Sequence, residues 1–198
     1  MKTNAMLRPD FAAIARWIKP DARILDLGCG DGSLLRYLCE QSGGRGYGVE
    51  IDDEGVLACA RNDVNVIQGD LERGLSAFAD GSFDYVILSQ TLQAVRSSES
   101  IVREMLRVGR EGIVSFPNFG YWRNRLQVVL GRMPVSSNLP YQWFDTPNIH
   151  LCTITDFENF CRNQRVRILE RVVMRGSGKV SFMPNLLGSL AVYRFERA

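Results

Sequence analysis

Apolar and polar positions alternate along the first 116 residues in a pattern that predicts strands and helices in turn. The apolar positions of residues 9–18 recur at i, i+3, i+4 and i+7, and Pro9 and Asp10 supply start signals, so the spacing predicts a helix. Short apolar runs predict five strands, at 22–27, 47–51, 64–68, 83–88 and 112–116. Helical periodicity separates them at 33–38, 53–62, 71–78 and 97–108. This alternation indicates an α/β fold with a parallel, doubly wound sheet.

The pattern changes after Pro117. Residues 118–130 look helical, but 131–150 hold three prolines without clear periodicity, and six aromatic side chains lie between 119 and 144. We interpret 118–152 as an aromatic and proline-rich insertion in a single domain that spans 1–198. Thr155 with Glu158 three residues later predicts a capping box that opens one more helix. Residues 166–174 and 190–195 predict two final strands, which brings the sheet to seven.

Composition narrows the classes of partner. The net charge is only +2, from 24 basic and 22 acidic residues, so the chain lacks the positive field that nucleic-acid binding usually needs. No apolar run approaches the length of a membrane span. The five cysteines form no CxxC pair, which argues against a disulfide framework or a metal site and favours a reducing compartment. We therefore expect a cytoplasmic protein with no bound metal, no nucleic-acid partner and no membrane contact.

The most informative segment for chemistry is 25–32, where a buried strand runs into Gly28, Gly30 and Gly32 before the next helix. Glycines at such a turn let the backbone lie against a ligand, and the helix start offers free N–H donors. Glu50 ends the following strand, twenty positions after Gly30, where a carboxylate can accept hydrogen bonds from both hydroxyls of a ribose. Together these features predict a ligand that carries adenosine.

A dinucleotide is the alternative ligand, because its binding motif also needs glycines and an acidic residue at this separation. That motif is G-x-G-x-x-G, whereas the third glycine arrives one residue early in this chain. Asp31 would also repel a pyrophosphate, while Asp31 and Asp26 suit a ligand with an ammonium and a sulfonium group. S-adenosylmethionine fits this pattern better. Cys29, between two glycines, is interpreted as a small side chain that fills a tight space rather than as a nucleophile.

Four segments in order, 26–32, 49–52, 68–71 and 83–89, resemble the successive motifs of class I methyltransferases. The resemblance implies a Rossmann-like, mostly parallel seven-stranded sheet with an antiparallel last strand. It also implies that the glycines hold the methionine end, Glu50 holds the ribose, Ile51 and Leu71 enclose the adenine, and Asp70 accepts from its amine. Asp70 has a simpler alternative role as the cap of a short helix. The residues expected to bind S-adenosylmethionine, or its product S-adenosylhomocysteine, are Asp26, Gly28, Cys29, Gly30, Glu50, Ile51, Asp70, Leu71 and Ser89.

No catalytic residue can be assigned from the sequence. The segment after the fourth strand, 89–95, carries neutral polar side chains and no His, Asp or Glu. The Asn/Asp-Pro-Pro-aromatic and Pro-Cys signatures of methyltransferases that act on nucleic acids are absent. His150, the only histidine, is interpreted as a hydrogen-bonded residue that fixes the insertion, with a catalytic base as the alternative. The aromatic side chains of the insertion can form a lid, a core or an interface.

At a finer level the chain resembles the bacterial MetW family of methionine biosynthesis proteins, most specifically in segments 88–94, 115–120, 131–135 and 144–153. This resemblance implies a partner, a homoserine O-acyltransferase, which would carry the chemistry. We therefore expect an accessory or regulatory protein that binds S-adenosylmethionine or S-adenosylhomocysteine. The alternatives are a scaffold with a relict site, or an active methyltransferase acting on a small molecule. In the latter, the side chains around the acceptor would come from Ser89, Gln90, Tyr121, Trp143 or His150.

Overall fold

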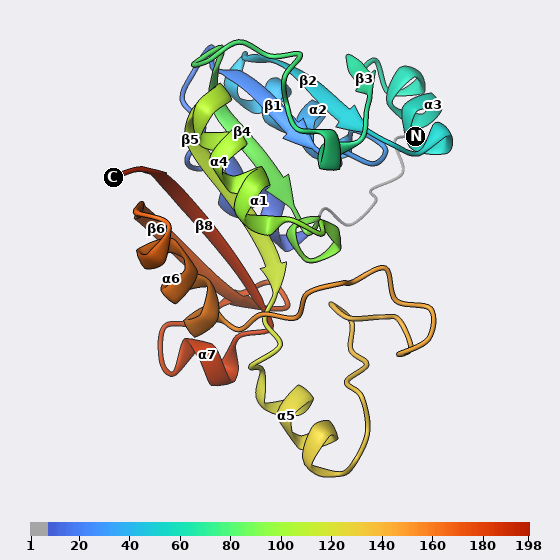
Figure 1. Ribbon diagram of the computed structural model, residues 1–198, viewed down its shortest axis with the longest axis vertical. Coiled ribbons are helices and arrows are strands. Elements are labelled where there is room, and N and C mark those ends of the chain that lie inside the picture. Colours follow the sequence, from blue (N-terminus) through green and yellow to red (C-terminus); the bar gives the residue numbers. More distant parts are fainter. Residues whose placement is uncertain (1–7) are drawn as a thin grey trace.

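The computed structural model describes residues 8–198, which form one eight-stranded sheet in the order β3-β2-β1-β4-β5-β8-β6-β7 (Figure 1). The strands from β3 to β5 pair in parallel, and β8 is antiparallel to both β5 and β6. This arrangement confirms the predicted fold class, with an eighth strand, β7, which is only two residues long and pairs with the end of β6. The strands are β1 (Arg23–Leu27), β2 (Arg45–Glu50), β3 (Val66–Gln68), β4 (Phe83–Ser89), β5 (Gly109–Pro117), β6 (Val166–Arg175), β7 (Gly178–Lys179) and β8 (Leu190–Arg197).

Helices cover both faces of the sheet, because successive side chains of each central strand point to opposite faces. In β4, Tyr85 and Ile87 pack with α1 and α2, whereas Val86 and Leu88 pack with α4 and α6. No helix within residues 8–198 is both long and apolar enough to cross a membrane. The helices are α1 (Pro9–Ala15), α2 (Ser33–Ser42), α3 (Asp53–Arg61), α4 (Ser98–Val108), α5 (Trp122–Val129), α6 (Ile154–Asn163) and α7 (Pro184–Leu187), with 3₁₀ turns η1 (Leu71–Arg73) and η2 (Leu92–Ala94).

Two local expectations were wrong. The helix expected over 71–78 is the single 3₁₀ turn η1, because Gly74 follows it with a φ of 78° that ends the turn. The capping box of α6 is made by Thr153 and Asp156 rather than by Thr155 and Glu158. Thr153 and Asp156 have the same separation, but the sequence pattern did not single them out. Tertiary contacts select the earlier one, because the backbone N–H of Ile154 at the helix start hydrogen-bonds to Asn118 Oδ1 at 3.3 Å.

Residues 118–152 leave the carboxyl end of β5 and project beyond the sheet as α5 and a long irregular chain (Figure 1). Asn118, which is fully buried, fixes the base of this excursion. Its Nδ2 donates to the carbonyl oxygens of Asn185 at 3.0 Å and Gly188 at 2.8 Å, and its Oδ1 accepts from the N–H of Gly120 at 3.0 Å. The segment is therefore anchored to α7 and the residue that follows it by a buried hydrogen-bond network.

Candidate functional site

A cavity of about 860 Å³ opens at the carboxyl ends of the parallel strands. It lies where the strand order reverses between β1 and β4, the place where α/β sheets of this kind bind their ligands. Five stretches of chain that come together only in the fold surround it. The lining residues are Gly28 after β1, residues 49–51 at the end of β2, residues 69–72 around η1, and Gln90, Thr91, 94–96 and Ile149.

Five of the nine residues expected to bind the cofactor line this cavity: Gly28, Glu50, Ile51, Asp70 and Leu71. Ile51 is 62% exposed, so an apolar side chain is presented to the open space of the cavity rather than to the core. Burial of such a side chain by a ligand is favourable. The other four expected residues, Asp26, Cys29, Gly30 and Ser89, are not among the lining side chains that the structure describes, and they lie next to or beneath it.

The first two glycines of the turn, Gly28 and Gly30, are required for different reasons. Gly28 and Gly30 both have positive φ, of 66° and 56°. A Cβ on Gly28 would lie 2.7 Å from Cγ2 of Thr91, so the absence of a side chain is needed for packing as well as for the backbone conformation. A Cβ on Gly30 would meet no heavy atom within 4 Å. The turn therefore packs closely against Thr91 at Gly28 and is open at Gly30.

Glu50 connects this turn to the end of β2. The residue is 9% exposed, and its carboxylate accepts three backbone hydrogen bonds. Oε2 accepts from Gly30 at 2.7 Å, and Oε1 accepts from Ile51 at 2.8 Å and Asp52 at 3.1 Å. A carboxylate offers about four lone-pair sites, so one remains open, on Oε2. Glu50 thus holds the shape of the site and retains capacity for one further donor.

Asp26 and Cys29 lie beside the turn in the interior. Burial raises the pKa of Asp26 to about 7, against the opposing effect of the Arg8 charge, and the negative charges of Glu50 and Asp10 raise it further. Burial also raises the pKa of the Cys29 thiol, which lies 3.6 Å from the thiol of Cys59. A buried thiol with a raised pKa is a weak nucleophile, so this geometry favours the space-filling interpretation of Cys29.

Ser89, the last residue of β4, takes part in a buried polar cluster with Asp10 and Ser115. Its hydroxyl lies 2.9 Å from Asp10 Oδ2 and 3.0 Å from the hydroxyl of Ser115, and it accepts from Arg8 Nη2 at 2.7 Å. Burial alone would raise the pKa of Asp10, but hydrogen bonds and charge from Arg8, with those of Ser89 and Ser115, lower it below its ordinary value. The cluster therefore keeps a negative charge beside the end of β4.

Asp70 caps the 3₁₀ turn η1 and also lines the cavity. Its Oδ1 accepts from the N–H of Glu72 at 2.9 Å, which caps η1, and the residue lines the cavity. His150 has contacts typical of a structural residue. The backbone N–H groups of Ile149 and His150 both donate to the carbonyl of Gln93, at 2.8 and 3.0 Å, and the ring Nε2 lies 3.0 Å from the carbonyl of Arg96. A ring nitrogen facing a carbonyl must carry the proton, so His150 donates there.

The sequence did not point to Thr91, Arg96 or Ile149 as lining residues. Ile149 comes from the excursion 118–152 and reaches the cavity because its backbone is pinned to Gln93. No local pattern marks such a contact, since it joins segments more than fifty residues apart. Gln90 gave a partial signal as a polar residue directly after a buried strand, and it adopts a left-handed φ of 55° that a non-glycine residue rarely takes.

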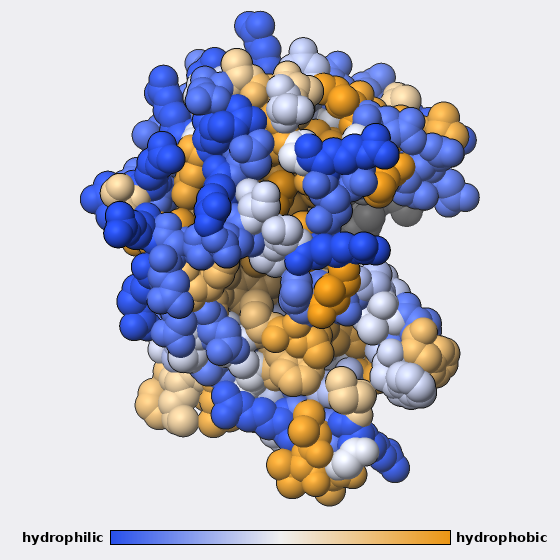
Figure 2. All heavy atoms as spheres, in the orientation of Figure 1, coloured by the Kyte–Doolittle hydropathy of each residue, from blue (hydrophilic) through white to orange (hydrophobic). Residues whose placement is uncertain are grey.

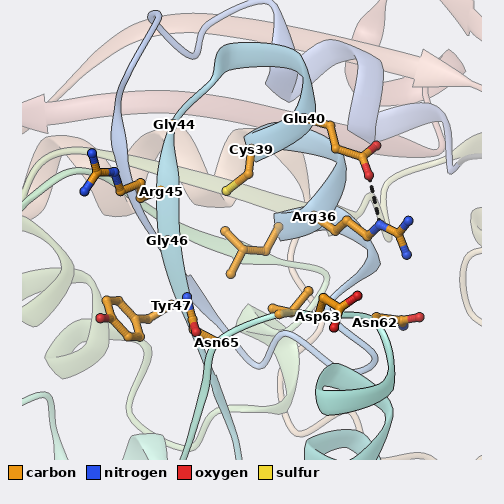
Figure 3. A pocket seen from close by; sticks show the side chains of 12 residues that line it. Arg36, Cys39, Glu40, Gly44, Arg45, Gly46, Tyr47, Asn62, Asp63 and Asn65 are labelled. Atoms are coloured by element: carbon orange, nitrogen blue, oxygen red, sulfur yellow. Dashed lines mark hydrogen bonds and ion pairs between the residues drawn. The ribbon is translucent and has the colours of Figure 1, made fainter.

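A second cavity, of about 510 Å³, lies between α2, the start of β2 and the loop 62–65 (Figure 3). Its lining includes the exposed side chains of Arg36 and Glu40, whose Nε and Oε1 atoms are 2.9 Å apart. None of the residues singled out in the sequence lines it. Residues 8–198 hold no group of three or more His, Cys, Asp or Glu side chains arranged to bind a metal ion. The cavity at the strand ends is therefore the candidate site.

Comparison with known sequences agrees with the resemblance described above. A family model described as methionine biosynthesis protein MetW matches residues 8–195. The bifunctional methionine biosynthesis protein MetXA/MetW of Rhodopirellula baltica is 39% identical over 209 aligned residues, which cover 98% of this chain and 34% of that protein. The chain spans about one third of the length of the curated relatives it matches.

Comparison with solved structures identifies the fold. An S-adenosylmethionine-dependent methyltransferase from Mesorhizobium loti superposes with a TM-score of 0.70 at 15% identity, covering 96% of this chain and 98% of that one. One from Thermotoga maritima gives 0.67 at 16% identity, covering 96% and 88%. At these identities the likeness establishes the class I methyltransferase fold alone.

Proposed function

The chain belongs to the methionine biosynthesis protein MetW family, and from this premise we propose that it binds S-adenosylmethionine or S-adenosylhomocysteine and acts in methionine biosynthesis as an accessory or regulatory partner of a homoserine O-acyltransferase. One observation carries the ligand part of the proposal. The turn at Gly28, the carboxylate of Glu50 and the side chains of Ile51, Asp70 and Leu71 line one cavity of about 860 Å³ at the topological switch point of the sheet.

The chemistry of the lining fits an adenosine with a sulfur-bearing tail. Gly28 lines the cavity with backbone alone, and the open lone pair of Glu50 can accept from a ribose hydroxyl. Ile51 and Leu71 offer apolar surface for the adenine, and Asp70 offers an acceptor for its amine. Bound S-adenosylmethionine would supply an activated methyl group. Whether the ligand is S-adenosylmethionine or S-adenosylhomocysteine, these residues bind and orient the nucleoside.

The partner proposal is supported by the relative from Rhodopirellula baltica, whose name joins MetXA and MetW in one protein. It is also supported by the surface of the excursion 118–152. Val129, Leu130, Trp143 and Phe144 are between 68% and 82% exposed. Figure 2 shows apolar side chains gathered over this lower part of the molecule. Clustered exposed aromatic and aliphatic side chains are typical of protein interfaces.

A cytoplasmic location also belongs to the proposal. All five cysteines are free thiols, which suits a reducing compartment. The family description places its members in a biosynthetic route.

Calorimetric titration with S-adenosylmethionine and S-adenosylhomocysteine tests the ligand part. We expect saturable one-to-one binding of at least one of them, and loss of affinity in Asp70→Ala but not in Asp63→Ala, an exposed aspartate remote from the lining. Absence of binding to either nucleoside would leave only the scaffold alternative. Incubation with a methyl-labelled cofactor and a panel of small acids and amines tests the enzymatic alternative, which predicts label in an acceptor.

The partner part is tested by mixing the chain with a purified homoserine O-acyltransferase and measuring both complex formation and acyl transfer. We expect a complex by size-exclusion chromatography, and acyltransferase activity that changes when the chain is added. Trp143→Ala with Phe144→Ala should weaken the complex, whereas Leu57→Ala, which removes a 56% exposed apolar side chain on α3, should not. Failure of the two proteins to associate would contradict the partner proposal.

A further inference from the structure

A small pocket lies within the excursion 118–152 and shares no lining residue with the cavity at the strand ends. Two of its lining residues, Pro134 and Leu139, are buried. Met133 and Tyr141 also line it and are 53% and 46% exposed. The pocket therefore combines a closed inner side with a wall of accessible apolar surface.

The size and lining of this pocket suit one small uncharged group. A cavity of roughly 150 Å³ accommodates a benzene molecule, so a volume of about 50 Å³ takes only the tip of an aliphatic side chain. The lining residues are apolar or aromatic, apart from the uncharged polar residues Gln142, Thr146 and Asn148. A charged group placed there would lose its water without gaining an ionic partner. The chemistry fits an apolar side chain of another protein better than a metabolite.

Hydrogen bonds hold the pocket in shape without a partner. The backbone N–H groups of Ser136 and Leu139 each donate to the carbonyl of the other residue, at 2.9 and 3.0 Å. Gln127 of α5 holds Val135, which follows Pro134, because its Oε1 accepts from the N–H at 3.1 Å and its Nε2 donates to the carbonyl at 3.2 Å. A preformed pocket loses little conformational entropy when it is filled, which favours its use as an anchor site.

The excursion that carries the pocket is positively charged. It contains three arginines, Arg123, Arg125 and Arg132, and a single acidic residue, Asp145. All three arginines are exposed, and none of them takes part in the ion pairs formed within residues 8–198. Arg132 directly precedes Met133 of the pocket wall. A complementary partner therefore carries carboxylates beside the apolar side chain that enters the pocket.

The comparison with the relative from Rhodopirellula baltica favours the acyltransferase as the occupant. The alignment covers 98% of this chain, so it includes the excursion, and the name of that protein joins MetXA to MetW. Two parts tethered in one protein are held at a high effective concentration, which favours contact between them. A lipid surface fits less well, because it offers no single side chain to enter a concave pocket.

We propose that the homoserine O-acyltransferase docks at the pocket beside Met133 and Tyr141, through a small aliphatic side chain whose neighbouring carboxylates pair with the arginines of the excursion. The inference rests on the proposed function, because it names the docking point and the surface chemistry of the same partner. It also separates this pocket from the rest of the exposed apolar surface. Val129, for example, is 82% exposed but does not line the pocket.

Introduction of the same charge inside and outside the pocket tests the inference. Met133→Glu places a carboxylate in the pocket wall, whereas Val129→Glu places one on α5 outside the lining. Both variants change the net charge equally, so a loss of affinity peculiar to Met133→Glu reports on the pocket. Calorimetric titration with purified acyltransferase should show binding at least about tenfold weaker for Met133→Glu, and less than about threefold weaker for Val129→Glu. Tyr141→Ala, which removes another part of the wall, should also weaken binding and serves if Met133→Glu loses the wild-type melting temperature.

Arg132→Gln tests the ionic part of the contact. The affinity of the wild-type chain should fall as sodium chloride is raised from about 0.05 M to about 0.5 M, because salt screens exposed charges. At low salt we expect Arg132→Gln to bind about threefold more weakly and to depend less on salt. Arg61→Gln, which removes an exposed arginine from the last turn of α3, is the matched control and should behave as wild type.

The outcomes distinguish failure of the docking point from failure of the partnership. Equal losses in Met133→Glu and Val129→Glu, or a complex that responds neither to Arg132→Gln nor to salt, would overturn the docking point and leave the proposed function intact. Binding of the wild-type chain to vesicles of phosphatidylserine and phosphatidylcholine, abolished in Met133→Glu, would assign the pocket to a lipid surface instead. A wild-type chain that forms no complex with the acyltransferase would overturn the proposed partnership and the docking point with it.

Discussion

The carboxylate of Glu50 accepts the backbone N–H of Gly30 at 2.7 Å. The two residues are twenty positions apart in the chain, and this hydrogen bond joins the end of β2 to the turn after β1. Because the same carboxylate also caps the N–H groups of Ile51 and Asp52, it shapes the cavity before any ligand arrives. The local fold therefore depends on this side chain, and so does the ligand binding that we propose.

Replacement of Glu50 by Gln should weaken both properties. An amide keeps the size of the side chain but offers one acceptor oxygen in place of two, so at least one of the three backbone donors loses its partner. We expect the free energy of unfolding to fall by about 1–3 kcal/mol and the affinity for S-adenosylmethionine to fall at least about tenfold. Chemical denaturation and calorimetry measure these changes. Glu54→Gln, an exposed position in the first turn of α3, is the control and should leave both quantities unchanged.

The first two glycines of the turn should respond differently to alanine. Gly30→Ala adds a methyl group in open space, so its cost should be limited to the left-handed backbone, about 1 kcal/mol. Gly28→Ala also drives the methyl group against Thr91, so we expect a loss of roughly 2 kcal/mol or more. Thermal denaturation of the two variants compares them directly. Equal losses of stability would contradict the close packing of Gly28 on Thr91.

Asp26 should make stability depend on pH in the opposite sense to most aspartates. Burial raises its pKa to about 7 in the folded chain, from the ordinary 3.8. Between these values the folded state keeps a proton that the unfolded state releases, so the contribution of Asp26 to stability is full below about pH 4 and declines up to pH 7. Because the pKa of Asp26 differs by about three units between the folded and unfolded states, its contribution to the free energy of unfolding is on the order of 4 kcal/mol.

The prediction is checked by the difference between wild type and Asp26→Asn, because other carboxylates, such as Asp10, have lowered pKa values and act in the opposite direction. The variant cannot ionise at this position. Its stability relative to wild type should therefore rise between pH 4 and pH 7 and stay constant above that. A stability difference that does not change with pH would show that Asp26 has no raised pKa.

The start of α6 offers a test of the capping box. Thr153 Oγ1 accepts from the N–H of Asp156 at 3.2 Å, and Asp156 Oδ2 accepts from the N–H of Thr153 at 3.0 Å. Thr153→Ala should reduce the free energy of unfolding by about 1 kcal/mol, the usual effect of losing a cap. Thr155→Ala removes only an exposed hydrogen bond to Asn185 and should cost less. The opposite order in denaturation experiments would support the cap that the sequence pattern alone suggested.

Periodicity alone determined most of the fold. Runs such as 83–88 and 97–108 carry their apolar residues at spacings that match one kind of element, and the structure places them in β4 and α4. The sequence also predicted the glycine turn, because a tight turn needs residues with positive φ. It predicted the place of Glu50 because the carboxyl ends of neighbouring parallel strands meet at one edge of the sheet. These features depend on local backbone chemistry and on strand order.

Tertiary structure decided what depends on contacts between distant segments. At the start of α6 the sequence pattern indicated Thr155 with Glu158, whereas Thr153 and Asp156 form the capping box, with Ile154 buried beside Asn118. Ile149 entered the cavity because the carbonyl of Gln93 holds its backbone, and Arg8 gained its position because Asp10 and Ser89 hold its guanidinium. Such hydrogen bonds join residues up to about a hundred positions apart, as Asp10 and Ser115 are, and no pattern within a short window of sequence records them.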